Sequence, residues 1–202
     1  MVSCPKKAGE LAAQMIGHKL ITKQTGPSGK ICNSVYVVER KYIRKEYYLA
    51  ILMDRVTQGP VIVASEQGGM DIEGVAASNP DAIITKAIDI NVGVTDVIAN
   101  EVATKMGFPE HSVDQAASVI KKLYKIFIER DATQIEINPL SETSDHQVMC
   151  MDAKFGFDDN AEFRQQEVFS WRDRSQEDPS EVKAAEYDLN FIKLDGKSHI
   201  NK

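Results

Sequence analysis

The sequence lacks three features that would place the chain in a specialised class of protein. It has only three cysteines, Cys4, Cys32 and Cys150, an odd number with wide spacing. This usage argues against a disulfide framework and for a reducing compartment. Acidic residues outnumber basic ones by 30 to 24, a net charge of -6. We therefore expect no broad cationic surface for nucleic acid or an anionic membrane. No apolar run in the sequence is long enough to span a bilayer.

What remains is the composition of an ordinary globular protein. The chain has 202 residues, of which 43% are hydrophobic and 27% charged. This length buries a sound core as one domain, or as one domain with an appendage. The first residues, MVSCPKKAGELAAQM, have neither the apolar core of a secretory signal nor the Arg-rich, acid-free character of a transit peptide.

The most informative stretch is a predicted hairpin. Two strand-like runs, 132–140 and 148–154, flank the polar segment SETSDHQ, which we interpret as a turn. Side chains alternate along a strand, so Glu136 and Asn138 share one face. A turn centred near Asp145 then sets Asn138 opposite Asp152 and Glu136 opposite Lys154. Four polar groups are thus predicted to share one face of the hairpin.

This polar face has two interpretations. Inward-facing carboxylates require a cation, and a carboxylate and amide cluster suits a hard ion such as Mg²⁺. The alternative is a solvated face on which Glu136 and Lys154 form an ordinary ion pair, and the hairpin alone favours it. Pro139 shifts the balance towards the metal, because it ends the strand directly after Asn138.

The rest of the chain predicts an antiparallel sheet covered by helices, a fold of the α+β class. Strands are predicted at 19–23, 34–39, 47–54, 60–65 and 83–90. Helices are predicted at 5–17, 70–78 and 95–106, from a capping box at 112–115 to residue 130, from the 158–160 cap to residue 169, and at 180–187. The charged segment ERKYIRKE (39–46) is predicted as a linker, and GPSG as a turn. The pair Gly68–Gly69 would let backbone amides approach a phosphate closely, or would make a plain turn.

Several long motifs resemble the β subunit of succinate–CoA ligase, a citric-acid-cycle enzyme family built on the ATP-grasp fold. They occur in the family's order from about residue 15 to residue 196. ERKY followed by EYYLA resembles the ADP-forming animal type. The motifs are KLITKQTG, ERKYIRKEYYLAILMDR, GPVIVASEQGGMDIEGVAASNP, IEINPL, CMDAKFGFDDNAEFRQ, SQEDP and YDLNFIKLDG.

The resemblance implies roles for the hairpin residues. Asn138 and Asp152 would bind Mg²⁺, which bridges the phosphates of bound ATP or ADP. Glu136 would be catalytic, close to an incoming phosphohistidine carried by the α subunit. The chain's own histidines, His18, His111, His146 and His199, do not match that histidine, and we interpret them as surface or loop residues.

The resemblance also places the nucleoside. Glu39 would meet the adenine edge with Tyr42 close by, and Glu46 would accept hydrogen bonds from the ribose hydroxyls. From the residues alone, the charged linker that holds all three reads as a solvated loop.

The family's organisation implies that this chain is an incomplete β subunit. Residues 1–188 would form a partial ATP-grasp domain, and residues 189–202 would begin the CoA-ligase domain. The resemblance further implies a mitochondrial matrix location and a heterodimer with the α subunit. Alternatives are a non-catalytic module that binds the α subunit, a GDP-forming isoform, or a related ligase of the malate–CoA ligase or ATP-citrate lyase type.

We expect this chain alone to have little or no ligase activity, because the family's phosphate-gripping lysine and glycine-rich loop have no counterpart in MVSCPKKAG. The measurement is thiokinase turnover after mixing with an intact α subunit. Turnover equal to that of a full-length β subunit would refute the expectation.

Overall fold

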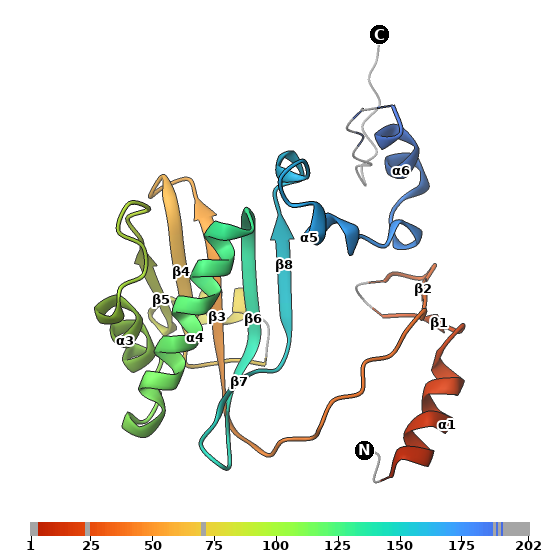
Figure 1. Ribbon diagram of the computed structural model, residues 1–202. Helices are drawn as coiled ribbons and strands as arrows, with labels where there is room; N and C mark the ends of the chain where they lie inside the picture. The colour runs from red at the N-terminus through yellow and green to blue at the C-terminus, as the bar shows by residue number, and fades with distance from the viewer. Residues whose placement is uncertain (1–3, 23–24, 70–71, 188, 190, 192–202) are drawn as a thin grey trace. The chain divides into compact units, whose positions relative to one another are not determined.

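The computed structural model describes residues 4–22, 25–69, 72–187, 189 and 191. The chain forms two compact units (Figure 1). One comprises Met1–Glu39 and Trp171–Lys202, and the other comprises Arg40–Ser170. No helix among the described residues is both long enough and apolar enough to cross a membrane. The predicted beginning of a second domain at 189–202 lies almost entirely outside the described residues.

The unit of Met1–Glu39 and Trp171–Lys202 is small and open. Its two-stranded antiparallel sheet joins the carboxy-terminal segment through side-chain bonds, such as Asn33 Nδ2 to Ser175 Oγ at 3.3 Å. None of its described hydrophobic side chains is fully buried. Its elements are α1 (Pro5–Met15), β1 (Lys19–Leu20), β2 (Lys30–Ile31), a 3-10 turn (Arg174–Gln176) and α6 (Pro179–Ala185).

The unit Arg40–Ser170 is built on a six-stranded antiparallel sheet. The strand order is β5-β4-β3-β6-β7, and β8 also pairs with β6. The strands are β3 (Ile43–Asp54), β4 (Gly59–Ser65), β5 (Ile83–Ala87), β6 (Ala132–Thr143), β7 (Val148–Cys150) and β8 (Ala153–Phe157). The helices are α2 (Ile72–Ser78), α3 (Asp96–Lys105), α4 (Glu110–Glu129) and α5 (Gln166–Ser170), with 3-10 turns at Pro80–Ala82 and Asp159–Ala161. This arrangement confirms the predicted helix-covered antiparallel sheet.

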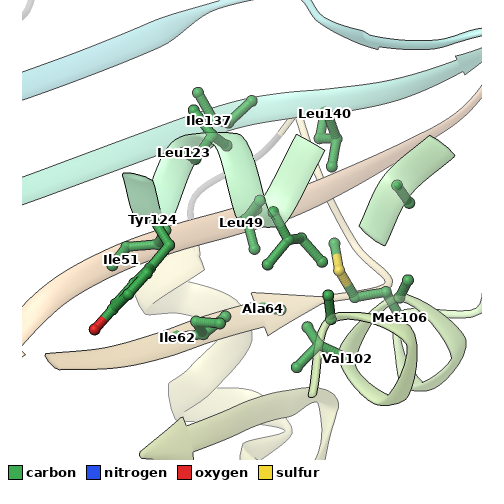
Figure 2. Packing of buried hydrophobic residues seen from close by; sticks show 14 of the residues in the cluster. Leu49, Ile51, Ile62, Ala64, Val102, Met106, Leu123, Tyr124, Ile137 and Leu140 are labelled. Atoms are coloured by element: carbon green, nitrogen blue, oxygen red, sulfur yellow. The ribbon is translucent and has the colours of Figure 1, made fainter. Parts of the chain in front are cut away.

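The core lies between the sheet and the helices α3 and α4 (Figures 1 and 2). Alternate residues of β3 and β6 face these helices and are almost completely buried, each contributing about 1.5–3 kcal/mol. The helices contribute a matching set of buried side chains. The sheet residues include Leu49, Ile51, Ile62, Ile137 and Leu140, and the helical ones include Val102, Met106, Ile120 and Leu123.

A one-residue irregularity in β6 changes which side chains face the helices. Tyr47 pairs with Leu140 but Leu49 pairs with Ile137, so β6 has one residue more than β3 in this interval. Such a bulge reverses the alternation of side chains. Before it, Ile135 and Ile137 are buried, and after it the buried residue on the helical face is Leu140. Asn138 lies within the irregular step.

Two predictions for residues 34–46 were wrong. Residues 34–39 form no strand, and Tyr36 is 91% exposed. A β-rich composition needs a partner strand, and this segment pairs with none in the described part of the chain. β3 instead begins at Ile43, so the second half of ERKYIRKE is strand rather than linker. Its charged residues are accommodated because this end of the strand is largely exposed.

Three further expectations were corrected. The helix α4 begins at Glu110, and the Ser112 hydroxyl donates to Glu142 instead of capping. β6 extends to Thr143, three residues into the predicted turn. The expected helix to residue 169 is a 3-10 turn followed by α5. The predicted ends of α3, α6 and the GPSG turn were confirmed within one or two residues.

An ion pair fixes the start of β6. Asp131 accepts two hydrogen bonds from Arg164, at 2.9 and 2.8 Å, and one from Gln165 Nε2 at 2.7 Å. These bonds, chiefly those from Arg164, lower the pKa of Asp131 to about 2. The pair joins the residue that precedes β6 to the segment before α5.

We expect Asp131→Asn to lower the thermal midpoint at pH 7, since asparagine tolerates the positive φ of 51° but removes the charge. A depressed carboxyl pKa stabilises the fold above its ordinary value of 3.8, and this contribution is lost as pH falls towards 2. The difference from wild type should therefore vanish in melts between about pH 4 and pH 2. Asp114→Asn, on the exposed side of α4, is the charge-matched control. A deficit that persisted undiminished at pH 2 would contradict this explanation.

Candidate functional site

The hairpin has the predicted register. Glu136 pairs with Lys154, and Ile137 pairs with Ala153. The Glu136 side chain is 16% exposed, and its Oε1 lies 3.6 Å from Lys154 Nζ. The ordinary cross-strand ion pair that the sequence left open is therefore present.

Asn138 and Asp152 face each other across the hairpin. The backbone N–H of Asn138 donates to the Asp152 carbonyl at 3.3 Å, which continues the register of Glu136 and Lys154. Opposite residues of an antiparallel pair project to the same side. Asp152 lies in the break between β7 and β8, where its Oδ1 accepts from Ala153 N at 2.9 Å.

The loop after β4 contacts Asn138 and Glu46 through the backbone of its two glycines. Gly69 N donates to Asn138 Oδ1 at 2.7 Å, and Gly68 N donates to the Glu46 carbonyl at 3.1 Å. The Glu46 carboxylate also lies close to Gly69, because a Cβ added there would be 2.2 Å from Glu46 Oε2. The fold thus brings together Glu46 of β3, Asn138 of β6 and the paired glycines.

Two further groups on this side of β3 and β6 were not predicted. Burial, followed by the charges of Glu136 and Glu73, raises the pKa of Tyr48 to about 12, so its phenol stays protonated and available as a donor. Ser141, paired with Glu46, is fully buried, and its hydroxyl makes no hydrogen bond within the described structure. A buried polar group without a partner is uncommon and calls for an explanation.

Of the two remaining predicted residues, Tyr42 is 66% exposed, and the Arg40 guanidinium lies 4.7 Å from the centre of its ring. Glu39 ends the Met1–Glu39 segment and belongs to the other compact unit. Within the unit Arg40–Ser170, the structure brings Glu46, Asn138 and the Gly68–Gly69 loop together.

The donor set at this junction fits a hard divalent cation. Asn138 and Asp152 offer an amide oxygen and a carboxylate, which are ligands that Mg²⁺ accepts. The Asn138 Oδ1 accepts a hydrogen bond from Gly69 N, which fixes the orientation of this amide oxygen.

The histidines were predicted only as surface or loop residues. His18 is exposed, and His199 lies outside the described residues. His111 and His146 are half-exposed, but both rings contact Glu142, whose side chain is 5% exposed. Glu142 was missed because the sequence assigned it to the turn, and only the irregularity in β6 orients it towards α4.

Comparison with protein families identifies the class. The profile of the ATP-grasp domain family matches residues 1–142. The match covers β3 to β6, including Glu46, the paired glycines and Asn138. The chain therefore belongs to the ATP-grasp domain family.

Individual relatives are more specific. The chain is 67% identical over 196 residues to the mitochondrial succinate–CoA ligase (ADP-forming) subunit beta of Neurospora crassa, covering 97% of this chain and 44% of that protein. It is 62% identical over 190 residues to the protein of the same name from Schizosaccharomyces pombe, covering 94% and 44%. The chain thus spans a little under half the length of these relatives. A structure of ATP citrate lyase from Methanothrix soehngenii, with citrate and coenzyme A, matches 91% of this chain and 42% of that one. Its TM-score is 0.64 at 18% identity, a likeness of fold.

We expect Gly68→Ala to displace the loop from Asn138. A Cβ at Gly68 would lie 2.3 Å from the Tyr47 carbonyl, so the backbone must shift, at a cost of about 1–3 kcal/mol in unfolding free energy. Urea unfolding measures this cost. Gly9→Ala is the control, since a Cβ there meets nothing within 4 Å. An unchanged midpoint for Gly68→Ala would contradict the packing described.

Proposed function

We propose that this chain is the nucleotide- and metal-binding part of a succinate–CoA ligase β subunit, ADP-forming. The whole enzyme would interconvert succinate plus CoA and succinyl-CoA, with ATP or ADP and Mg²⁺. The identity of 67% over 97% of the chain to a relative of that name supports the assignment. Both relatives are mitochondrial proteins by name, which supports a mitochondrial location, and we propose the matrix.

In this proposal Asn138 and Asp152 hold the Mg²⁺ ion. The observation that carries the proposal is their opposition across the hairpin, with the Gly69 amide directed at Asn138 Oδ1 at 2.7 Å. When bound, Mg²⁺ neutralises charge on the nucleotide phosphates during phosphoryl transfer. The chain's own residues would orient that ion, and the Gly69 N–H holds the Asn138 side chain in place.

The nucleoside contacts follow from the same junction. Glu46 is the acceptor for the ribose hydroxyls, because its exposed carboxylate lies beside Gly69 and Asn138. The exposed Tyr42 ring and Glu39 border the base.

Glu136 is the proposed catalytic carboxylate. Its partly buried carboxylate lies 3.6 Å from Lys154 Nζ, and its charge is one of the causes that raise the pKa of Tyr48. A histidine brought by the α subunit would be oriented by this carboxylate. The α subunit is therefore the proposed protein partner. We also propose the division into a partial ATP-grasp domain at 1–188 and the start of a CoA-ligase domain at 189–202.

Nucleotide titration tests this function. We expect ADP binding that depends on Mg²⁺ and weakens about tenfold or more in Asn138→Ala and in Asp152→Ala, because each removes one oxygen ligand. Isothermal titration calorimetry with and without Mg²⁺ gives the affinity. Gln134→Ala, an exposed polar residue on the same strand, is the control. Absence of binding by the wild-type chain would favour the non-catalytic interaction module instead.

A further inference from the structure

A second cluster of metal-binding side chains lies on the helix-covered face of the sheet. His111 Nε2 is 2.9 Å and His146 Nδ1 is 3.3 Å from Glu142 Oε1, and the Ser112 hydroxyl donates to the same oxygen at 3.1 Å. The three ligand atoms lie within 4.8 Å of one another. The two imidazole rings meet edge to face, with their centres 4.2 Å apart.

Three separate elements supply these ligands. His111 is in the first turn of α4, Glu142 is near the end of β6, and His146 is in the turn that follows. The strand and the helix are anchored in the core by Leu140 and Ala116, which are fully buried. The cluster is therefore held by the folded sheet and helix rather than by one mobile loop.

The donor types indicate a borderline transition-metal ion. Two imidazoles and one carboxylate are a ligand set of Zn²⁺, at about 2.0–2.2 Å from each donor atom. Donors around such an ion are about 3.3 Å apart when tetrahedral. The two separations from Glu142 Oε1, 2.9 and 3.3 Å, are already near this value. The two imidazole nitrogens lie within 4.8 Å of each other and would approach by at most about 1.5 Å.

Glu142 gives a physical reason for a cation. Its side chain is 5% exposed, and a buried ionised carboxylate is costly unless positive charge meets it. Neutral imidazoles offer hydrogen bonds but no net charge. A bound divalent ion would supply the positive charge that offsets Glu142, and both histidines would bind that ion.

Arg44 is the group that opposes metal binding. Its Nη1 lies 3.1 Å from His146 Nδ1 and 3.3 Å from His146 Nε2. Metal binding through Nδ1 leaves the proton on Nε2, so the guanidinium would have to move aside. The Arg44 side chain is exposed, and this movement disturbs no buried contact.

A cavity of about 330 Å³ adjoins the cluster. Arg44, Tyr47, Pro109, His111 and Glu142 are among the residues that line it. A three-ligand zinc site leaves a fourth position for water, and the cavity has room for one.

We propose that His111, Glu142 and His146 form a site for Zn²⁺ or a similar transition-metal ion, separate from the oxygen site at Asn138 and Asp152. The two sites are at different places on β6. Glu142 pairs with Lys45 and lies near the pair of Leu140 and Tyr47, whose side chains face the helices. Asn138 instead accepts a hydrogen bond from Gly69. The proposal therefore does not depend on the proposed function, and it concerns different donor atoms.

Zinc titration of the purified chain at neutral pH tests the proposal. We expect one Zn²⁺ per chain, and a loss of affinity of about tenfold or more in His111→Ala and in His146→Ala. His18→Ala, an exposed histidine of the other unit, should bind like wild type. Arg44→Ala should bind more tightly, because a competing positive charge is removed.

A thermal melt separates metal binding from damage to the fold. Zn²⁺ should raise the midpoint of wild type and of His18→Ala, but not that of the His111 and His146 variants, whatever their midpoints without metal. No Zn²⁺ binding to wild type would overturn the proposal. Undiminished binding in both histidine variants would also overturn it, because the metal would then be held elsewhere, such as by the cysteines.

Discussion

The pairing of β3 with β6, with one extra residue in β6 beside Asn138, is the constraint on which the rest depends. Without that residue, the alternation of buried and polar side chains would continue unchanged through the strand. With it, the apolar residues on both sides, Ile137 and Leu140, reach the same core. Asn138 is left facing the glycine loop, and Glu142 is turned towards α4.

One strand therefore serves two polar clusters. On one side, Asn138, Asp152 and Gly69 form an oxygen-rich junction beside Glu46. On the helical side, the Glu142 carboxylate contacts two imidazoles and accepts a hydrogen bond from a serine hydroxyl. The junction suits a hard ion and phosphate, and the imidazole cluster suits a softer ion. The match to the ATP-grasp domain family covers Asn138 and Gly69 of the junction and also His111 and Glu142 of the imidazole cluster.

The sequence was sufficient to predict the features that depend on local pattern. The register of Glu136 with Lys154 follows from the turn position, and the ends of α3 follow from Thr95 and Gly107. The prediction of a strand at 34–39 was wrong. The segment has the composition of a strand, but it has no pairing partner in the described structure. Glu142 and its histidines were missed because strict alternation and the predicted turn both concealed its orientation. The Gly69 contact to Asn138 joins residues distant in sequence, and no local pattern indicates it.

The most direct test of the central claim uses a paramagnetic nucleotide. Chromium(III)·ADP is inert to ligand exchange, so its metal stays on the phosphates and cannot move to the histidines. In a spectrum of the isotopically labelled chain, it should broaden the amide signals of Gly69 and Asp152 and leave that of Ser112 sharp. Strong broadening of Ser112 with sharp signals for Gly69 and Asp152 would place the nucleotide on the helical side and contradict the account.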